Sequence, residues 1–273
     1  MKRGMRGVLY ALLAAAVFMC GVRGVRASEE KEGALRGVIG AALPSVGQYA
    51  EETGNTGARP SGKKMPLVCI DPGHQRHSMQ DTEPNGPGSS VMKQKLTSGT
   101  DGVVSGKAEY EVNLEISLLL KAELEKRGYE VLMTRESDDV TLSNAERAAM
   151  ANKAGADVFL RIHCNSSADS SVHGVLCYKP GKANPYLSQE VIRQSETLAG
   201  LLLLHQTAMT GQAKIGLLDG DDMTGINWAE MPVVIVETGY MSNPDEDLFL
   251  ADRKGQSLIA EGLANGVDAY FAS

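Results

Sequence analysis

Val68-Cys69-Ile70-Asp71-Pro72-Gly73-His74 is an apolar run that ends in turn residues and a histidine. The run from Leu67 to Ile70 predicts a buried strand, and Asp-Pro-Gly predicts the turn that ends it. The imidazole of His74 is therefore expected just beyond the carboxyl end of a strand, where open α/β sheets bind their ligands.

Two later apolar segments end in the same way. Residues 157–162 run into His163, and residues 232–236 run into Glu237. The carboxyl ends of parallel strands meet at one edge of a sheet, so these two side chains are expected to lie near His74. The pattern predicts one shared site.

Helical and strand patterns alternate along the rest of the chain. Strands are expected at 129–134 and 175–178, and helices near 111–127, 142–154, 187–210 and 258–270. This alternation predicts an α/β layer fold with a largely parallel sheet and helices on both faces.

The residue types at the strand ends point to a zinc site. A catalytic zinc ion takes about three protein ligands and leaves one position open for water. His74 and His163 are two candidates, and His77 is an alternative histidine. Glu109 is the third candidate because it lies just before a predicted helix, where the helix dipole favours an anion. Glu111 remains its alternative.

Glu237 is the candidate general base. A carboxylate at the end of an apolar strand is costly unless it is used or paired. Near a metal, such a group can take a proton from water and return it to a leaving nitrogen. His173 and His205 are taken as structural.

The N-terminus resembles an export signal. Basic residues precede an apolar core from Val8 to Gly21, which is too short for a typical membrane span, and Val25-Arg26-Ala27 resembles a cleavage site. Residues 1–27 are therefore predicted to be a signal peptide, with an uncleaved anchor or a lipidated N-terminus as the alternatives. The protein is expected outside the cytoplasm, secreted or in the cell envelope.

Composition and charge bound the other possibilities. Residues 28–64 are predicted to be a flexible linker, and residues 65–273 a single catalytic-size domain. A net charge of −7 does not suggest a nucleic-acid binder. Three cysteines follow the predicted signal, and an odd number is not a disulfide framework; only a Cys164–Cys177 bridge stays open.

A long polar stretch separates the first histidine from the first helix. Residues 75–108 are rich in Gly, Pro, Ser and Thr. A structureless loop of this length is unusual in a compact domain and is often functional. We expect either a surface insertion or a rim of the substrate groove.

From Leu67 to Tyr270 the chain resembles the zinc-dependent N-acetylmuramoyl-L-alanine amidases of the third amidase family, which are cell-wall hydrolases. Residues 68–74 resemble the family's opening strand with its first zinc histidine, and residues 109–114 resemble its Glu-x-x-x-Asn-Leu element. Residues 162–165 resemble its Ser-Ile-His-x-Asn segment, and residues 231–243 resemble the segment with the catalytic glutamate.

The resemblance implies zinc on His74, Glu109 and His163, and it favours Glu109 over Glu111. It implies a twisted mixed sheet in a single domain of the amidase and zinc-exopeptidase type. The implied reaction is hydrolysis of the amide between N-acetylmuramic acid and the L-alanine of the peptidoglycan stem peptide, with Glu237 as the base. The expected partner is peptidoglycan, and the expected state is a monomer without a membrane span in the mature chain.

Two departures and two alternatives remain. Arg161 stands where the family commonly has serine, and the interval from His74 to Glu109 is longer than in simple members. A different zinc peptidase of the cell wall is one alternative. A non-catalytic wall-binding or regulatory protein on the same fold is the other.

Overall fold

The computed structural model describes residues 65–273. The predicted signal peptide at 1–27 and the predicted linker at 28–64 lie outside these described residues. The predicted catalytic domain at 65–273 coincides with them. The elements follow in this order: β1 (Leu67–Pro72), β2 (Met79–Pro84), β3 (Met92–Leu96), α3 (Glu109–Lys126), β4 (Glu130–Met133), α4 (Asn144–Ala154), β5 (Val158–Asn165), β6 (Val175–Lys179), α5 (Gln189–Thr210), β7 (Lys214–Asp219), α6 (Thr224–Asn227), β8 (Val233–Tyr240), α7 (Pro244–Ala251) and α8 (Arg253–Ala272).

The main sheet is six-stranded, in the order β4-β1-β5-β8-β6-β7. β4, β1, β5 and β8 run parallel to one another, whereas β6 is antiparallel to β8 and β7 is parallel to β6. The predicted mixed, largely parallel sheet is thus confirmed. β1, β5 and β8 are adjacent, so the three strands that carry the candidate residues end at the same edge.

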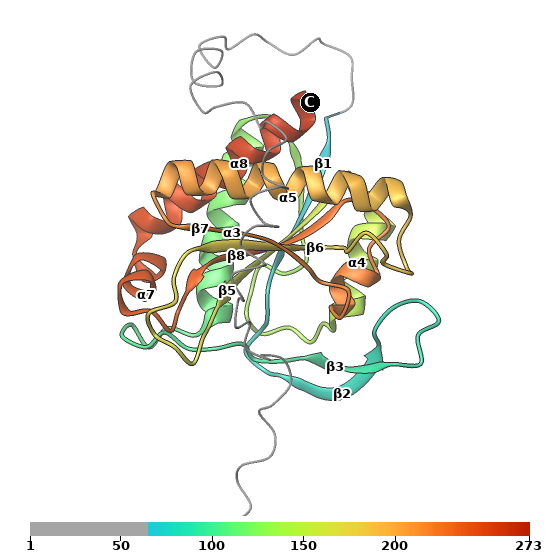
Figure 1. Ribbon diagram of the computed structural model, residues 1–273, viewed down its shortest axis with the longest axis horizontal. Helices are drawn as coiled ribbons and strands as arrows, with labels where there is room; N and C mark the ends of the chain where they lie inside the picture. Colours follow the sequence, from blue (N-terminus) through green and yellow to red (C-terminus); the bar gives the residue numbers. More distant parts are fainter. Residues whose placement is uncertain (1–64) are drawn as a thin grey trace, which may run out of the picture. The chain divides into compact units, whose positions relative to one another are not determined.

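Helices cover both faces of this sheet (Figure 1). Leu160 of β5 packs with apolar side chains of α3, α5 and α8, while its neighbour Phe159 packs on the opposite face against α4 and α6. This division follows from the alternation of side chains along a strand. Cys69, Cys164 and Cys177 are all buried free thiols, so the Cys164–Cys177 bridge is absent from the described part of the chain.

The helix ends follow from local sequence signals. Ser143 accepts a hydrogen bond from the backbone N–H of Glu146, and the Glu146 carboxylate accepts one from the N–H of Ser143. This reciprocal capping box starts α4. Gly155 ends the same helix in the left-handed conformation, at φ 65°.

The long polar stretch contains a hairpin, which the sequence analysis did not predict. β2 and β3 pair antiparallel in a separate two-stranded sheet. The N–H of Asn85 donates to the carbonyl of Val91 at 2.8 Å and closes the loop between them. Apolar alternation is weak in both strands, because most of their side chains are at least partly exposed; the pattern that marks a buried strand is therefore missing.

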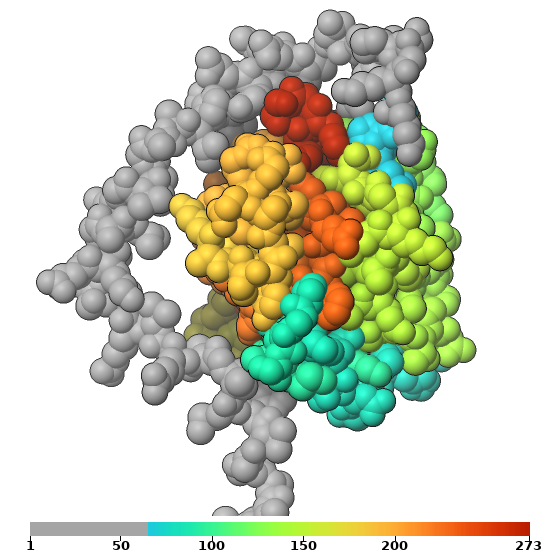
Figure 2. Space-filling view, turned by 90° about the vertical axis from the view of Figure 1, so that its right-hand side faces the viewer, coloured from blue at the N-terminus to red at the C-terminus, as the bar shows by residue number. Residues whose placement is uncertain are grey.

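Polar contacts anchor this hairpin to the body of the domain. The indole N–H of Trp228 donates to the carbonyl of Pro84, and the Asn227 amide donates to the carbonyl of Asn85, each at 2.9 Å. The Asn144 amide donates to the carbonyl of Lys95 at 2.8 Å. Figure 2 shows the blue-green hairpin against the orange segment that contains α6. These contacts hold the hairpin in a fixed position against the domain.

Three short elements also went unpredicted, namely β7, α6 and α7. The start of α7 does carry a readable signal, since Asn243 caps the helix and Pro244 occupies its first turn. Within residues 65–273, no helix combines the length and apolarity needed to cross a membrane.

Candidate metal centre

Three neighbouring strands deliver their polar residues to one end of the sheet. His163 and Glu237 are register partners on β5 and β8. The turn after β1 is tied to β5, because the N–H of Gly73 donates to the carbonyl of Ile162 at 2.8 Å. His74 follows that turn. The ends of the three strands therefore lie together, as predicted.

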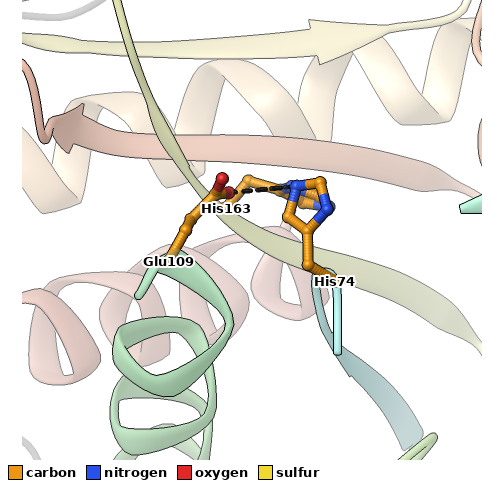
Figure 3. Close-up of side chains that lie close together, drawn as sticks. All are labelled: His74, Glu109 and His163. Carbon is orange, nitrogen blue, oxygen red and sulfur yellow. Dashed lines mark ion pairs between the residues drawn. The ribbon is translucent and has the colours of Figure 1, made fainter. Parts of the chain in front are cut away.

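The carboxylate of Glu109 points toward both histidines (Figure 3). Its Oε1 atom is 3.3 Å from Nε2 of His74 and 3.3 Å from Nδ1 of His163. One ligand-type atom from each residue lies within 4.8 Å of the others, and no further such group of three occurs among the described residues. The three side chains come from a turn, a helix N-terminus and a strand.

Glycine and an unusual backbone angle shape the turn that brings the histidines together. A Cβ atom on Gly73 would lie 2.3 Å from Nε2 of His163, so any side chain there would overlap the imidazole. His74 adopts φ 59°, in the left-handed region that non-glycine residues rarely occupy. Such a conformation is costly and tends to be kept where a site needs it.

The Glu109 carboxylate is buried and held by several donors. Oε1 accepts from the backbone N–H of Cys164 at 3.1 Å and from the Asn113 amide at 3.2 Å. Oε2 accepts from the backbone N–H of Thr100 at 3.0 Å. Glu109 is only 3% exposed, so these contacts fix one orientation of the carboxylate.

The electrostatic setting of the triad suits a cation. Burial lowers the pKa of His163 to about 4, so its ring is neutral at pH 7. Burial would also lower the pKa of His74, but the Glu109 carboxylate outweighs it and raises that pKa. Burial would raise the pKa of Glu109, and the histidines lower it well below its usual range. A neutral imidazole and a carboxylate are the forms that bind metal.

Glu237 is a carboxyl group in a costly position. Its Oε2 atom is buried and has no hydrogen-bond partner in the described part of the chain. Burial, followed by the charge of Glu109, raises its pKa to about 8. An unsatisfied buried carboxyl oxygen beside the triad fits a group whose partner is a water molecule or a substrate.

The donor set passes a test of fit for zinc. Two imidazoles and one carboxylate are a common catalytic zinc set, with room for a further ligand. Nε2 of His163 is buried without a partner among the described residues, and Nδ1 of the same ring is 3.3 Å from Oε1 of Glu109, so the protein leaves hydrogen-bonding capacity of this imidazole unused. The geometry and the chemistry of the three donors therefore agree.

Alternatives weighed from the sequence lie elsewhere. The Glu111 carboxylate accepts from the N–H of Ala108 at 3.2 Å, as a helix-capping group does. His77 and His173 are exposed and His205 is partly exposed, and none of the three joins the triad. Glu109 therefore lies in the triad, whereas Glu111 caps the helix.

The charged side chains that hold the turn of His74 could not be predicted from the sequence. Asp71, which was assigned to the turn, is fully buried and forms ion pairs with Arg147 at 2.7 Å and Arg161 at 2.8 Å. Arg147 also donates to the carbonyl of His74 at 2.9 Å. Arg161, the departure from the family's serine, fits because a Cβ on Gly225 would lie 1.8 Å from its Nη1. Buried charge pairs between distant segments leave no local pattern.

Comparison with known proteins gives a consistent result. The family model described as N-acetylmuramoyl-L-alanine amidase matches residues 68–269. The amidase AmiC of Neisseria meningitidis is 24% identical over 256 residues, covering 81% of this chain and 56% of that protein, so the chain spans little more than half of that relative. The germination-specific amidase of Bacillus subtilis is 25% identical, covering 77% of this chain and 81% of that protein.

Solved structures agree with the sequence relatives. The N-acetylmuramyl-L-alanine amidase from Mycobacterium smegmatis superposes with a TM-score of 0.69 at 25% identity, covering 76% of this chain and 97% of that one. The catalytic domain of CwlV from Paenibacillus polymyxa superposes with a TM-score of 0.61 at 28% identity, covering 76% and 99%. Both similarities extend over nearly the whole of the solved chains.

Proposed function

The chain belongs to the N-acetylmuramoyl-L-alanine amidase family, and we propose that it hydrolyses the amide bond between N-acetylmuramic acid and the L-alanine of the peptidoglycan stem peptide. One observation supports this most strongly: a triad of His74, Glu109 and His163 lies beside the strand position of Glu237. A wall-binding protein without activity would have no need for a buried, unsatisfied carboxyl group at this place.

Zinc is the proposed cofactor, with His74, Glu109 and His163 as its ligands. When bound there, zinc would polarise the amide carbonyl and lower the pKa of a water molecule. Glu109 offsets part of the positive charge and holds both imidazoles in place through its Oε1 atom.

Glu237 acts as the general base in this scheme. Its Oε2, which has no partner in the part of the chain that the structure describes, takes a proton from the attacking water. The same carboxyl group then gives the proton to the leaving nitrogen, which becomes the free amino group of L-alanine. Its raised pKa suits this exchange, because a group that titrates near neutral pH can both accept and donate a proton.

The remaining assignments are also part of the proposal. Residues 1–27 act as a signal peptide, residues 28–64 as a linker and residues 65–273 as the catalytic domain. The protein then works outside the cytoplasm, as a secreted or cell-envelope monomer on peptidoglycan. The described residues 65–273 all belong to one compact unit, which supports the last boundary.

Metal content and wall release test this function together. Residues 65–273 should carry one zinc per chain and release dye from labelled cell wall, and His163→Ala should lose both. Product analysis should find new N-terminal L-alanine and no new peptide cleavage. A wild-type protein that takes up no zinc and releases no dye would overturn the proposal.

A further inference from the structure

The end of the 75–108 insertion contacts two residues of the triad. The backbone carbonyl of Thr97 is 2.9 Å from Nδ1 of His74, and the Thr97 hydroxyl is 3.2 Å from the same atom. Thr100 donates its N–H to Oε2 of Glu109, and the N–H of Glu109 donates to the carbonyl of Thr100 at 2.8 Å. We call residues 97–105 the bracing segment.

Gly99 lets the bracing segment approach this closely. It adopts φ +85°, and a Cβ atom there would lie 2.5 Å from Oε2 of Glu109 and 3.0 Å from Cδ2 of His74. The backbone of the segment therefore lies directly against both side chains. Any shift of the segment changes the space that they occupy.

A carboxylate of α7 fixes the other end of the bracing segment. Asp247 is fully buried and accepts from the N–H of Val104 at 2.6 Å, the N–H of Ser105 at 2.7 Å and the hydroxyl of Ser105 at 2.6 Å. Gly102 passes so close that a Cβ there would lie 2.1 Å from Oδ1 of Asp247. These short contacts hold the turn in one conformation.

From this chain of contacts we propose that Asp247 is a positioning residue for the metal centre. It fixes the 102–105 turn, the turn fixes Thr100, and Thr100 orients the carboxylate of Glu109. The insertion thus serves to preorganise the metal ligands, whatever it contributes to the groove. Altering a group that hydrogen-bonds directly to a metal ligand, as Thr100 does to Glu109, commonly changes metal affinity by about 10- to 100-fold. The inference rests on the proposed zinc site.

The test compares Asp247→Asn with Asp245→Asn in the protein with zinc removed and then restored. Asp245 is exposed on the same helix, so its change removes the same charge without touching the turn. Zinc affinity, measured by competition with a chromogenic chelator, should fall by about tenfold or more in Asp247→Asn and stay unchanged in the control. Denaturant unfolding of the metal-free proteins is measured in parallel.

The two measurements separate positioning from simple stability. If Asp247 only stabilised the fold, its variant would unfold more easily but the folded protein would bind zinc as tightly as the control. That result would overturn the inference. If the wild type itself bound no zinc, the proposed function would fail first, which is a different outcome.

A glycine pair serves as the second test if Asp247→Asn does not fold. Gly99→Ala and Gly88→Ala both place a side chain at a positive φ in the insertion, but nothing lies within 4 Å of a Cβ on Gly88. The backbone strain is therefore matched, and only Gly99→Ala presses on Glu109. We expect weaker zinc binding in Gly99→Ala alone, and equal zinc affinities in the two variants would contradict the inference.

Discussion

Glu237 combines burial and a raised pKa with an Oε2 atom that has no hydrogen-bond partner within residues 65–273. In the metal-free protein this arrangement destabilises the ionised carboxylate of Glu237, because desolvation and the nearby charge of Glu109 both disfavour the charged form. His163 shows the complementary case, since burial keeps its imidazole neutral and able to bind metal at pH 7. At the residue scale, the site is built from groups whose ordinary protonation has been altered.

Glu237→Gln should abolish most of the activity and leave the metal in place. Loss of a general base typically costs about 10²- to 10⁴-fold in rate. Wall-release rate and zinc content are the two measurements. Glu230→Gln is the control, because Glu230 is an exposed acid close to the start of the same strand. Zinc loss in Glu237→Gln would show that the carboxylate belongs to the metal site instead.

The stability of the metal-free protein should depend on pH through Glu237. A folded pKa of about 8 exceeds the ordinary value of 4.5, so the folded state holds a proton that the unfolded state releases. Stability from this group is complete below about pH 4.5 and is lost as pH rises towards 8. Over this pH range, the free energy of unfolding of metal-free Glu237→Gln should therefore rise relative to that of the wild type, by about 1 kcal/mol or more at pH 8. Urea unfolding of both proteins at pH 5 and pH 8 measures this difference in stability. The same difference at both pH values would contradict the prediction.

At the scale of elements, β1 and its turn are joined to their neighbours by charge. Asp71 at the end of β1 meets Arg147 of α4, Arg161 of β5 and the hydroxyl of Thr134 after β4. Burial would raise the pKa of Asp71, but the two arginines and these hydrogen bonds lower it well below its usual range. The turn that carries His74 is therefore held by side chains from three other segments.

Asp71→Asn should destabilise the domain strongly. Removing one partner of a buried ion pair leaves the others uncompensated and costs about 3–5 kcal/mol. Asp81→Asn is the control, since Asp81 is exposed and lies 3.9 Å from Lys95; its change should cost at most about 1 kcal/mol. Denaturant unfolding measures both. The contribution of the Asp71 carboxylate to the stability of the wild type should also decrease as the pH falls below the ordinary pKa of aspartate. Equal losses in the two variants would refute the role of the cluster.

At the scale of the whole domain, we expect metal binding at the proposed site to be linked to folding. The triad joins β5, α3 and the turn after β1, which are distant in sequence, so an ion bound there favours the folded state. The bracing segment adds a fourth segment to the triad, because Thr100 donates its N–H to Oε2 of Glu109. Stability and metal occupancy should consequently vary together.

Removing zinc from residues 65–273 should lower the melting temperature. Zinc at about 100 times its Kd would contribute about 2.7 kcal/mol, which corresponds to roughly 5–10 °C for a domain of this size. Thermal melts with and without a chelator give the shift. His163→Ala serves as the control, because a variant without the site should show no shift. A chelator effect of the same size in His163→Ala would place the stabilising metal elsewhere.

Local pattern was enough to predict much of this molecule. Apolar runs ending in His74, His163 and Glu237 indicated one sheet edge, because strand and helix periods are properties of consecutive residues. The order of four motifs identified the family. Glu109 could be separated from Glu111 only by that resemblance, since both residues suit a helix N-terminus.

Tertiary structure alone decided the rest. Most side chains of the β2–β3 hairpin are at least partly exposed and show no hydrophobic period, so its pairing depends on anchors such as Trp228. The ion pairs of Asp71 and the contact of Asp247 with Ser105 join residues far apart in the chain. No sequence spacing marks such partners, because they meet only after the sheet and helices have packed. The sequence by itself determined which residues reach the site, and packing determined what holds them there.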